Sequence, residues 1–440
     1  MTRRSLLRAG FLGLAGVSLA DVLRARSRAS ASIATAADEL SIIVVWLDGG
    51  PPQHETYDPK PEAPDEFRGP LGAIATSVPT VRLSDQLVEH ARLMHKMAII
   101  RSMHHDNDDH FAAAHWMLTG YHGSNAINMA PQFPSAGSII AKLKGAKAAG
   151  VPAYVGLPNT HSVGLVPGYH GAAYLGRAYN PFAADGDPNS ESYKAPGLTL
   201  PGGLSVTRLE DRRSLLDAFD VTRRAAEAQA NEGDRFTHQA FDMLTSERAR
   251  RAFDLSMESP KLRDRYGRHQ WGQSALLARR LVEAGVRFVT LTFGGWDVHS
   301  SIENTMKNVL PVLDRAVATL VDDLDQRGRL GNTMVLVMGE FGRTPRINKG
   351  LPQDPIPGRD HWGRLMSVLV AGGGVRGGTL VGASNARGSA PSDLPITPGD
   401  LVATFYDRLG IDPETTFYDR LSRPITIVPH GGAPIRELFA

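Results

Sequence analysis

The sequence predicts an α/β fold in which helices flank a mostly parallel central sheet, and two observations support this. Four apolar runs have the composition of buried strands, and each lies next to glycines or polar residues; they span 41–47, 287–293, 333–338 and 366–371. Between the second and third runs, residues 303–327 place Val309, Leu313 and Val317 on one face at helical spacing. A strand, a helix and a strand in this order are typical of a parallel sheet with crossover helices.

Length and composition favour one large domain. Of the 440 residues, 42% are hydrophobic, which is enough apolar surface for a sizeable core. The charges nearly balance at a formal net charge of +2, so no nucleic-acid partner is expected. The chain contains no cysteine, which excludes disulfides, thiolate metal sites and thiol nucleophiles. It also excludes a sulfatase that makes formylglycine from cysteine.

The first residues have the features of a targeting segment. Arg3 and Arg4 precede an apolar stretch at 9–20, and small residues that suit cleavage follow it. This pattern resembles a twin-arginine signal peptide, which we assign to residues 1–36. We therefore expect export to the periplasm or cell envelope, with no permanent membrane span once the signal is cleaved. An uncleaved anchor is the alternative.

The remaining chain, 38–440, is expected to form a single α/β domain that carries an insertion at about 145–270. The first part of this insertion is rich in Gly and Pro without clear periodicity, and its second part is charged and has helical spacing. We expect the insertion to cover the functional site.

Candidate metal ligands follow, or closely precede, the predicted strands. In open α/β sheets, ligands gather outside the carboxyl ends of the strands, and carboxylate oxygens with imidazole nitrogens suit a divalent cation. One Asp at a strand end is more often a turn or helix-capping residue, but several such ends together favour a metal site. The candidate ligands are Asp48, Asp297, His299, Glu340 and His361.

The segment 104–110 is the densest group of other candidate ligands, and a predicted helix follows it. His110 would lie in the first turn, where free N–H groups and the helix dipole favour an oxyanion such as phosphate or sulfate. Two alternatives remain open for this segment. Asp108 or Asp109 could simply cap the helix beside solvated histidines, or the segment could be a separate metal-storage site.

Two arginines lie close in sequence to the candidate ligands. Arg343 and Arg359 have forked donors that can bind a tetrahedral oxyanion, although either could instead pair with a carboxylate beside the site. His54, Glu55 and Asp58 lie on the loop after the first strand and are predicted either to support the site or to be ordinary surface residues.

Several ordered motifs resemble the sulfatase-like domain-of-unknown-function 1501 family, from about Ile42 to Ile411. The motifs that carry the resemblance are Trp46-Leu47-Asp48-Gly49-Gly50-Pro51, Phe67-Arg68-Gly69, Ala98-Ile99-Ile100-Arg101-Ser102, Met117-Leu118-Thr119-Gly120, Trp296-Asp297-x-His299, Met338-Gly339-Glu340-Phe341-Gly342-Arg343-Thr344-Pro345 and Gly358-Arg359-Asp360-His361-Trp362. This resemblance implies an alkaline phosphatase-like α/β fold, because the family is similar to that superfamily.

The superfamily resemblance implies particular roles for the candidate residues. It implies that Asp48, Asp297, His299 and His361 hold metal, and it puts His110 where the superfamily has a serine or threonine nucleophile. Glu340-Phe341 stands where an Asp-His pair is usual, so the second metal would lose an imidazole. His110 could ligate a metal, accept a phosphoryl group, or leave the attack to water.

Two functions follow from these observations. The first is a metal-dependent hydrolase of phosphate or sulfate esters, including carbohydrate-derived ones, with His110, Arg343 and Arg359 in catalysis. Its cofactor would be one or two divalent ions, zinc in the first place, or else calcium, magnesium or manganese. The alternative is a non-catalytic, metal-containing envelope protein that binds a glycan or a protein partner.

Overall fold

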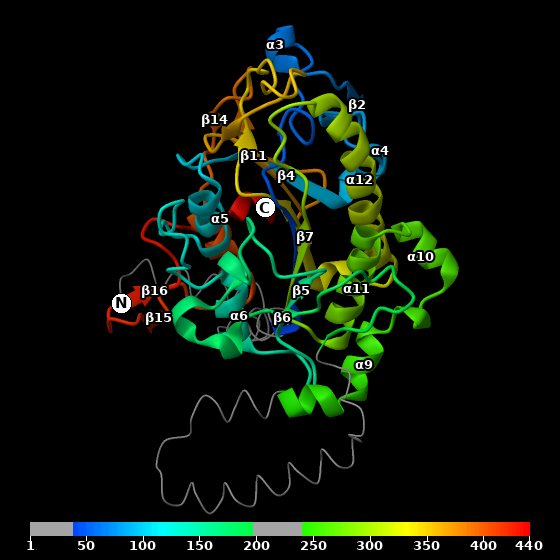
Figure 1. Cartoon of the computed structure of the whole chain (residues 1–440), viewed down its shortest axis with the longest axis vertical. Coiled ribbons are helices and arrows are strands. Elements are labelled where there is room, and N and C mark those ends of the chain that lie inside the picture. Colours follow the sequence, from blue (N-terminus) through cyan, green and yellow to red (C-terminus); the bar gives the residue numbers. More distant parts are fainter. Residues whose placement is uncertain (1–37, 197–239) are drawn as a thin grey trace, which may run out of the picture.

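The computed structural model describes residues 38–196 and 240–440, and its centre is an eight-stranded sheet of order β12-β4-β11-β8-β1-β7-β5-β6 (Figure 1). The strands of this sheet are β1 (Ser41–Leu47), β4 (Met97–Met103), β5 (Tyr154–Leu157), β6 (Phe182–Ala183), β7 (Phe288–Phe293), β8 (Thr333–Met338), β11 (Met366–Gly372) and β12 (Leu380–Val381). Every neighbouring pair is parallel except the two pairs that include β11. The predicted α/β class with a mostly parallel sheet is confirmed.

Helices cover both faces of the sheet (Figure 1). Among the described residues the α-helices include α3 (Asp65–Arg68), α4 (Val88–Leu93), α5 (His110–Thr119), α6 (Ala136–Lys144), α9 (Glu247–Phe253), α10 (Pro260–Tyr266), α11 (Gln270–Ala284), α12 (Ile302–Gln326) and α13 (Pro398–Arg408). One core packs α4, α9, α11 and α12 against one face of the sheet, and the other packs α5, α6 and α13 against the opposite face. The domain therefore has three layers.

Short elements connect these layers. Four two-stranded sheets are formed by β2 (Ala73–Ala75) with β3 (Arg82–Ser84), β9 (Gly342–Arg343) with β10 (His361–Trp362), β13 (Ala383–Ser384) with β14 (Pro391–Asp393), and β15 (Thr416–Tyr418) with β16 (Pro424–Thr426). Single 3₁₀ turns lie at Met94–Lys96, Gly168–His170, Ala173–Leu175, Arg177–Tyr179, Leu255–Met257, Leu330–Asn332 and Arg436–Leu438.

The composition of β1 explains its central place. All seven of its residues are buried, and they alternate between the two cores: Ile43 and Val45 face one layer of helices, while Val44 and Trp46 face the other. A strand that is covered on both faces needs apolar residues at every position. Burying each such aliphatic side chain contributes about 1.5–3 kcal/mol relative to leaving it exposed.

One edge of the sheet collects the polar loops. Because β1, β4, β7 and β8 run in the same direction, Asp48, the segment 104–110, Asp297 and Glu340 all follow strands that end at this edge. Strand β11 runs the other way, so it begins where its neighbours end. His361 precedes β11 in the chain and therefore lies at the same edge. The antiparallel direction of β11 thus places His361 at the same edge as the residues that follow the parallel strands.

Most predicted elements agree with the structure. The helix predicted over 303–327 is α12, and the strand predicted at 366–371 is β11. The region 145–270, interpreted as an insertion, contributes β5 and β6 to the central sheet, although its stretch 197–239 lies outside the described residues. The predicted leader, 1–36, also lies outside them. Within 38–196 and 240–440, no helix combines the length and the apolarity needed to cross a membrane.

Candidate metal centre

Asp297, His299 and His361 bring three donor atoms together at the polar edge of the sheet. Oδ1 of Asp297 lies 2.9 Å from Nε2 of His299 and 3.1 Å from Nε2 of His361. The two Nε2 atoms are 3.0 Å apart. Asp297 and His299 are on the loop after β7, whereas His361 begins β10, so the cluster joins two separate parts of the chain.

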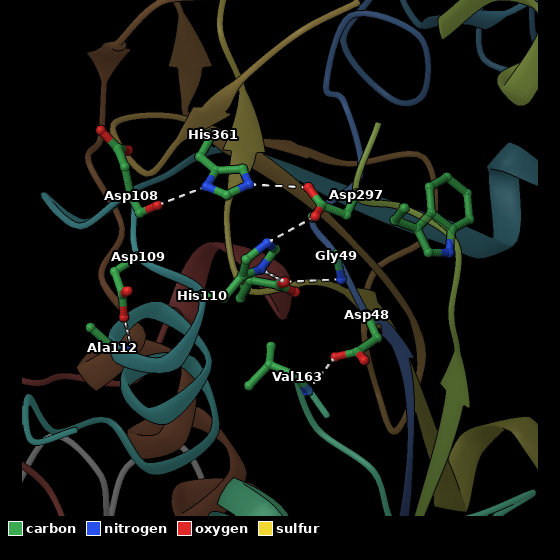
Figure 2. A network of polar contacts seen from close by, with 12 residues as sticks. Asp48, Gly49, Asp108, Asp109, His110, Ala112, Val163, Asp297 and His361 are labelled. Carbon is green, nitrogen blue, oxygen red and sulfur yellow. Dashed lines mark hydrogen bonds and ion pairs between the residues drawn. The ribbon is translucent and has the colours of Figure 1, made fainter. Parts of the chain in front are cut away.

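His110 extends this cluster from the first residue of α5. Its Nε2 lies 3.3 Å from Oδ2 of Asp297, and its Nδ1 lies 2.8 Å from Oε1 of Glu340. Figure 2 shows that the His110 ring and the His361 ring both point toward the carboxylate of Asp297. Donor atoms of His110, Asp297 and His361 all lie within 4.8 Å of one another, a spacing that one metal ion can span.

Each of the three histidines is held through its second ring nitrogen. Nδ1 of His299 lies 2.8 Å from Oδ1 of Asp360, and Nδ1 of His361 lies 2.9 Å from the carbonyl oxygen of Asp108. Nδ1 of His110 lies 2.8 Å from Oε1 of Glu340. Carboxylate and carbonyl oxygens only accept hydrogen bonds, so Nδ1 carries a proton in each ring, and Nε2 is the nitrogen that a cation could take once the ring is neutral. Metal-ligating histidines commonly have this arrangement.

Arg343 fixes the carboxylate of Asp297. Its guanidinium is completely buried and lies 2.8 Å from Oδ1 of Asp297. The remaining donors bind main-chain oxygens of Gly49, Gly50, Trp296 and Arg359. Arg343 therefore joins the loops after β1 and β7, and its side chain also donates to the main chain of Arg359.

The electrostatics of this cluster favour positive charge. Burial alone would raise the pKa of Asp297, but hydrogen bonds from His110, His361 and Arg343 hold that pKa well below its usual range. Burial would likewise lower the pKa of His110, but hydrogen bonds to Asp297 and Glu340 raise it to about 9. The space between these two carboxylates thus attracts a positive charge, whether the charge is a proton or a metal ion.

Glu340 is the most deeply buried acid of the site, with no exposed surface. Oε1 accepts hydrogen bonds from His110 and from the backbone N–H of Gly49, the latter at 2.9 Å. Oε2 has no hydrogen-bond partner within the part of the chain that the structure describes. Burial, followed by the nearby charge of Asp48, raises the pKa of Glu340, although His110 opposes this shift.

Gly49 allows the close approach of these loops. It has a φ of +117°, and a Cβ at this position would lie only 2.3 Å from the backbone nitrogen of Asp297. A side chain at position 49 would therefore push the β1 loop away from Asp297 and Glu340.

Asp48 lies next to the cluster rather than within it. Its Oδ1 accepts a hydrogen bond from the indole of Trp46 at 2.9 Å. It also accepts one from the backbone N–H of Val163 at 2.9 Å (Figure 2). Asp48, Asp297 and His299 line an open pocket of about 290 Å³. The Asp297 side chain is 48% exposed, so the pocket gives solvent and small molecules access to it. The contact with Val163 also brings the predicted insertion to the site.

Arg359 is not brought to the cluster. It is completely buried, and its guanidinium pairs with the equally buried Glu55 at 2.8–3.1 Å. Its other donors bind carbonyl oxygens of Phe67, Thr344 and Pro345. His54 and Asp58, from the same loop as Glu55, are also buried and are therefore not surface residues.

The segment 104–110 supports the site through several separate contacts. Nε2 of His105 donates to the carbonyl oxygen of Glu340 at 2.6 Å, and the Asp108 carbonyl holds His361. Asp109 caps α5 by accepting the N–H of Ala112 at 2.9 Å. Asp109 therefore caps α5, as one of the predicted alternatives states, and His110 of the same segment enters the site.

Sequence reasoning did not single out Asp360 and Trp46, although Asp360 holds His299 and Trp46 holds Asp48. A carboxylate beside a candidate histidine ligand is a usable signal for Asp360, because ligating histidines are commonly backed by carboxylates. No sequence signal identifies the Asp108 carbonyl, since its role depends only on where the backbone passes.

Comparisons with known proteins give one family and several distant structures. A sequence model described as "Protein of unknown function (DUF1501)" matches residues 39–439. A search of curated proteins gave no match. Among solved structures, the PsFucS1 sulfatase from Pseudoalteromonas sp. is similar at 12% identity and a TM-score of 0.40, with 87% of this chain and 72% of that chain covered.

Two further structures are similar at comparable levels. The phosphonate monoester hydrolase SpPMH from Silicibacter pomeroyi has 11% identity and a TM-score of 0.33, with coverage of 90% of this chain and 76% of that chain. The alkaline phosphatase from the Antarctic bacterium TAB5 has 12% identity and a TM-score of 0.33, with coverage of 78% and 94%. At these TM-scores the likenesses carry no argument about activity.

Proposed function

The chain belongs to the DUF1501 family of proteins of unknown function, and from this premise we propose that it is an exported, metal-dependent hydrolase of phosphate or sulfate esters. One observation carries the proposal. Three histidines each donate through Nδ1 to an oxygen and turn Nε2 toward the carboxylate of Asp297. Side chains that merely filled space would have no reason to share this orientation.

The donor atoms fit a divalent cation. Those of Asp297, His299 and His361 are 2.9–3.1 Å apart, and a tetrahedral zinc site with bonds of about 2.0–2.1 Å sets its ligands about 3.3 Å apart. The buried Oε2 of Glu340, without a partner among the described residues, also suits a nearby cation. Nitrogen and oxygen donors without sulfur favour zinc but also admit manganese.

The residues of the chain have distinct parts in this proposal. Asp297, His299 and His361 would hold the ion, with Asp360 and the Asp108 carbonyl keeping the imidazoles in place. Arg343 keeps Asp297 charged and correctly turned. When bound, a divalent ion would polarise the ester and lower the pKa of water. The pocket beside Asp48 gives an ester access to this point.

Metal removal tests this proposal. We expect the purified protein to hydrolyse an aryl phosphate or an aryl sulfate, to fall to the background rate after treatment with a chelator, and to recover when zinc or manganese is added. Release of the coloured phenol measures turnover, and elemental analysis measures the metal. Bound metal without turnover on any ester would favour the non-catalytic envelope protein, and a chain without bound metal would contradict both functions.

We also propose that the protein is exported through the twin-arginine pathway. Replacing Arg3 and Arg4 together by lysine is expected to keep the chain in the cytoplasm, because the paired arginines of such a leader are read by the export machinery. Immunoblots of periplasmic and cytoplasmic fractions measure the effect. Arg8→Lys is the matched control and should be exported normally. Equal periplasmic amounts of the double variant and the wild type would refute this route.

A further inference from the structure

We infer that His110 is a ligand of the proposed cation, positioned by Glu340, and that it is not an acceptor of the phosphoryl or sulfuryl group. This inference rests on the proposed function and assigns a role to the residue at the start of α5. The site would then hold its cation with three imidazoles and the carboxylate of Asp297.

The hydrogen bond at Nδ1 determines which nitrogen is available. Oε1 of Glu340 lies 2.8 Å from Nδ1 of His110 and also accepts the N–H of Gly49 at 2.9 Å. Glu340 is completely buried, so both contacts hold its carboxylate in one orientation. A carboxylate oxygen accepts only from a proton-bearing nitrogen, so the neutral ring keeps its proton on Nδ1, at the shorter contact, and its lone pair is on Nε2, whose contact with Asp297 is 3.3 Å.

The surroundings of Nε2 suit a ligand and not a nucleophile. Nε2 lies 3.3 Å from Oδ2 of Asp297, and donor atoms of His110, Asp297 and His361 lie within 4.8 Å of one another. A nucleophilic nitrogen needs an open approach to phosphorus or sulfur. Here the nitrogen faces a carboxylate oxygen, which would repel an anionic ester but would share a cation with the imidazole.

Packing keeps the ring in this orientation. The His110 ring packs against both Phe341 and His361, with ring centroids 5.0 Å and 4.3 Å away. Phe341 is completely buried, so it forms a fixed wall against the imidazole. Asp109 caps α5 and fixes the backbone from which the ring projects. Rotation of the ring toward the pocket would break its contacts with both carboxylates.

Metal affinity and ligand counting test the inference. Metal-free protein is titrated with Zn²⁺ by calorimetry, and X-ray absorption counts the imidazoles around the bound zinc. Wild type should show three imidazoles and His110→Ala two, with an affinity loss of at least ~100-fold. Glu340→Gln should keep three imidazoles but weaken affinity about 10–100-fold, because the group behind the ligand loses its charge. His122→Ala, an exposed histidine just after the same helix, should match wild type.

Further measurements separate the outcomes. Circular dichroism of the metal-free variants identifies those that fail to fold, and Glu340→Gln keeps the test decisive if His110→Ala does not fold. Equal affinity and equal imidazole counts for wild type and His110→Ala would overturn the inference, while loss of zinc in His361→Ala would still support the proposed function. A phosphohistidine at position 110, detected by mass spectrometry after an alkaline quench with an aryl phosphate, would also overturn it. Failure of the wild-type protein to bind zinc would contradict both the proposed function and this inference.

Discussion

Replacing Asp297 by asparagine is expected to remove the bound metal and the hydrolytic activity together. Oδ1 of Asp297 lies 2.9 Å and 3.1 Å from the two histidine nitrogens, and Oδ2 faces His110, so one carboxylate contacts all three imidazoles. Asparagine keeps the shape but loses the charge and one acceptor. We expect zinc affinity to fall by more than ~100-fold, since residues that only orient ligands already cost about 10–100-fold.

Two other aspartate variants provide comparisons for the zinc affinity of Asp297→Asn. Asp360→Asn removes only the charge behind His299, so its zinc affinity should fall between that of wild type and that of Asp297→Asn. Asp65→Asn changes an exposed residue of α3 and should leave the affinity unchanged. Calorimetric titration of the metal-free proteins measures all three. Equal affinity for Asp297→Asn and Asp65→Asn would show that the carboxylate cluster is not the metal site.

Disrupting the Arg359–Glu55 pair is expected to destabilise the whole domain. Both side chains are at most 1% exposed, and Arg359 also binds three carbonyl oxygens from other loops. Removing either partner leaves a buried charge without compensation, which costs about 3–5 kcal/mol. Arg359→Met and Glu55→Gln should each lower the free energy of unfolding by that order, and the double variant by less than the sum.

Urea unfolding of the four proteins in this cycle measures the coupling between the two residues. The exposed pair Arg92–Glu89 is the control, and Arg92→Met should cost less than about 1 kcal/mol. The sequence-based alternative, in which Arg359 acts directly on substrate, predicts a different result. In that case Arg359→Met would lose turnover while its unfolding curve overlaid that of wild type.

The sequence was sufficient to predict four strands of the sheet, β1, β7, β8 and β11, and the edge at which the site lies. The runs at 41–47 and 333–338 are apolar at almost every position, which only a strand buried on both faces requires. Strand ends followed by Asp48, Asp297 and Glu340 then had to meet at one edge, because the strands are parallel. These inferences need only local composition and strand direction.

Other features depend on contacts between distant parts of the chain. Strand β11 has the same composition in either direction, so its antiparallel pairing, which explains the place of His361, is set by packing between β8 and β4. The short β5 and β6 lie in a region without a strong pattern. Arg359 and Glu55 are 304 positions apart, and no local signal identifies their pairing.

In the candidate site, too, some features follow from the local sequence and others depend on distant contacts. Residue type and position predicted the metal-ligating candidates, but the orientation of each ring is set by partners from elsewhere, such as Asp360 for His299 and Glu340 for His110. Arg343 was predicted from its motif as an oxyanion-binding residue, but in the structure its guanidinium donates to four backbone carbonyls and to Asp297. A motif identifies the residue, and only tertiary contacts determine its partner.

The most direct test of the metal centre is anomalous X-ray diffraction from crystals of the protein purified without chelator, recorded on both sides of the zinc absorption edge. We expect a peak within bonding distance, about 2.0–2.2 Å, of Asp297, His299 and His361, with Nε2 of His110 turned toward it. A metal bound elsewhere, with these four side chains still in direct contact with one another, would contradict the account.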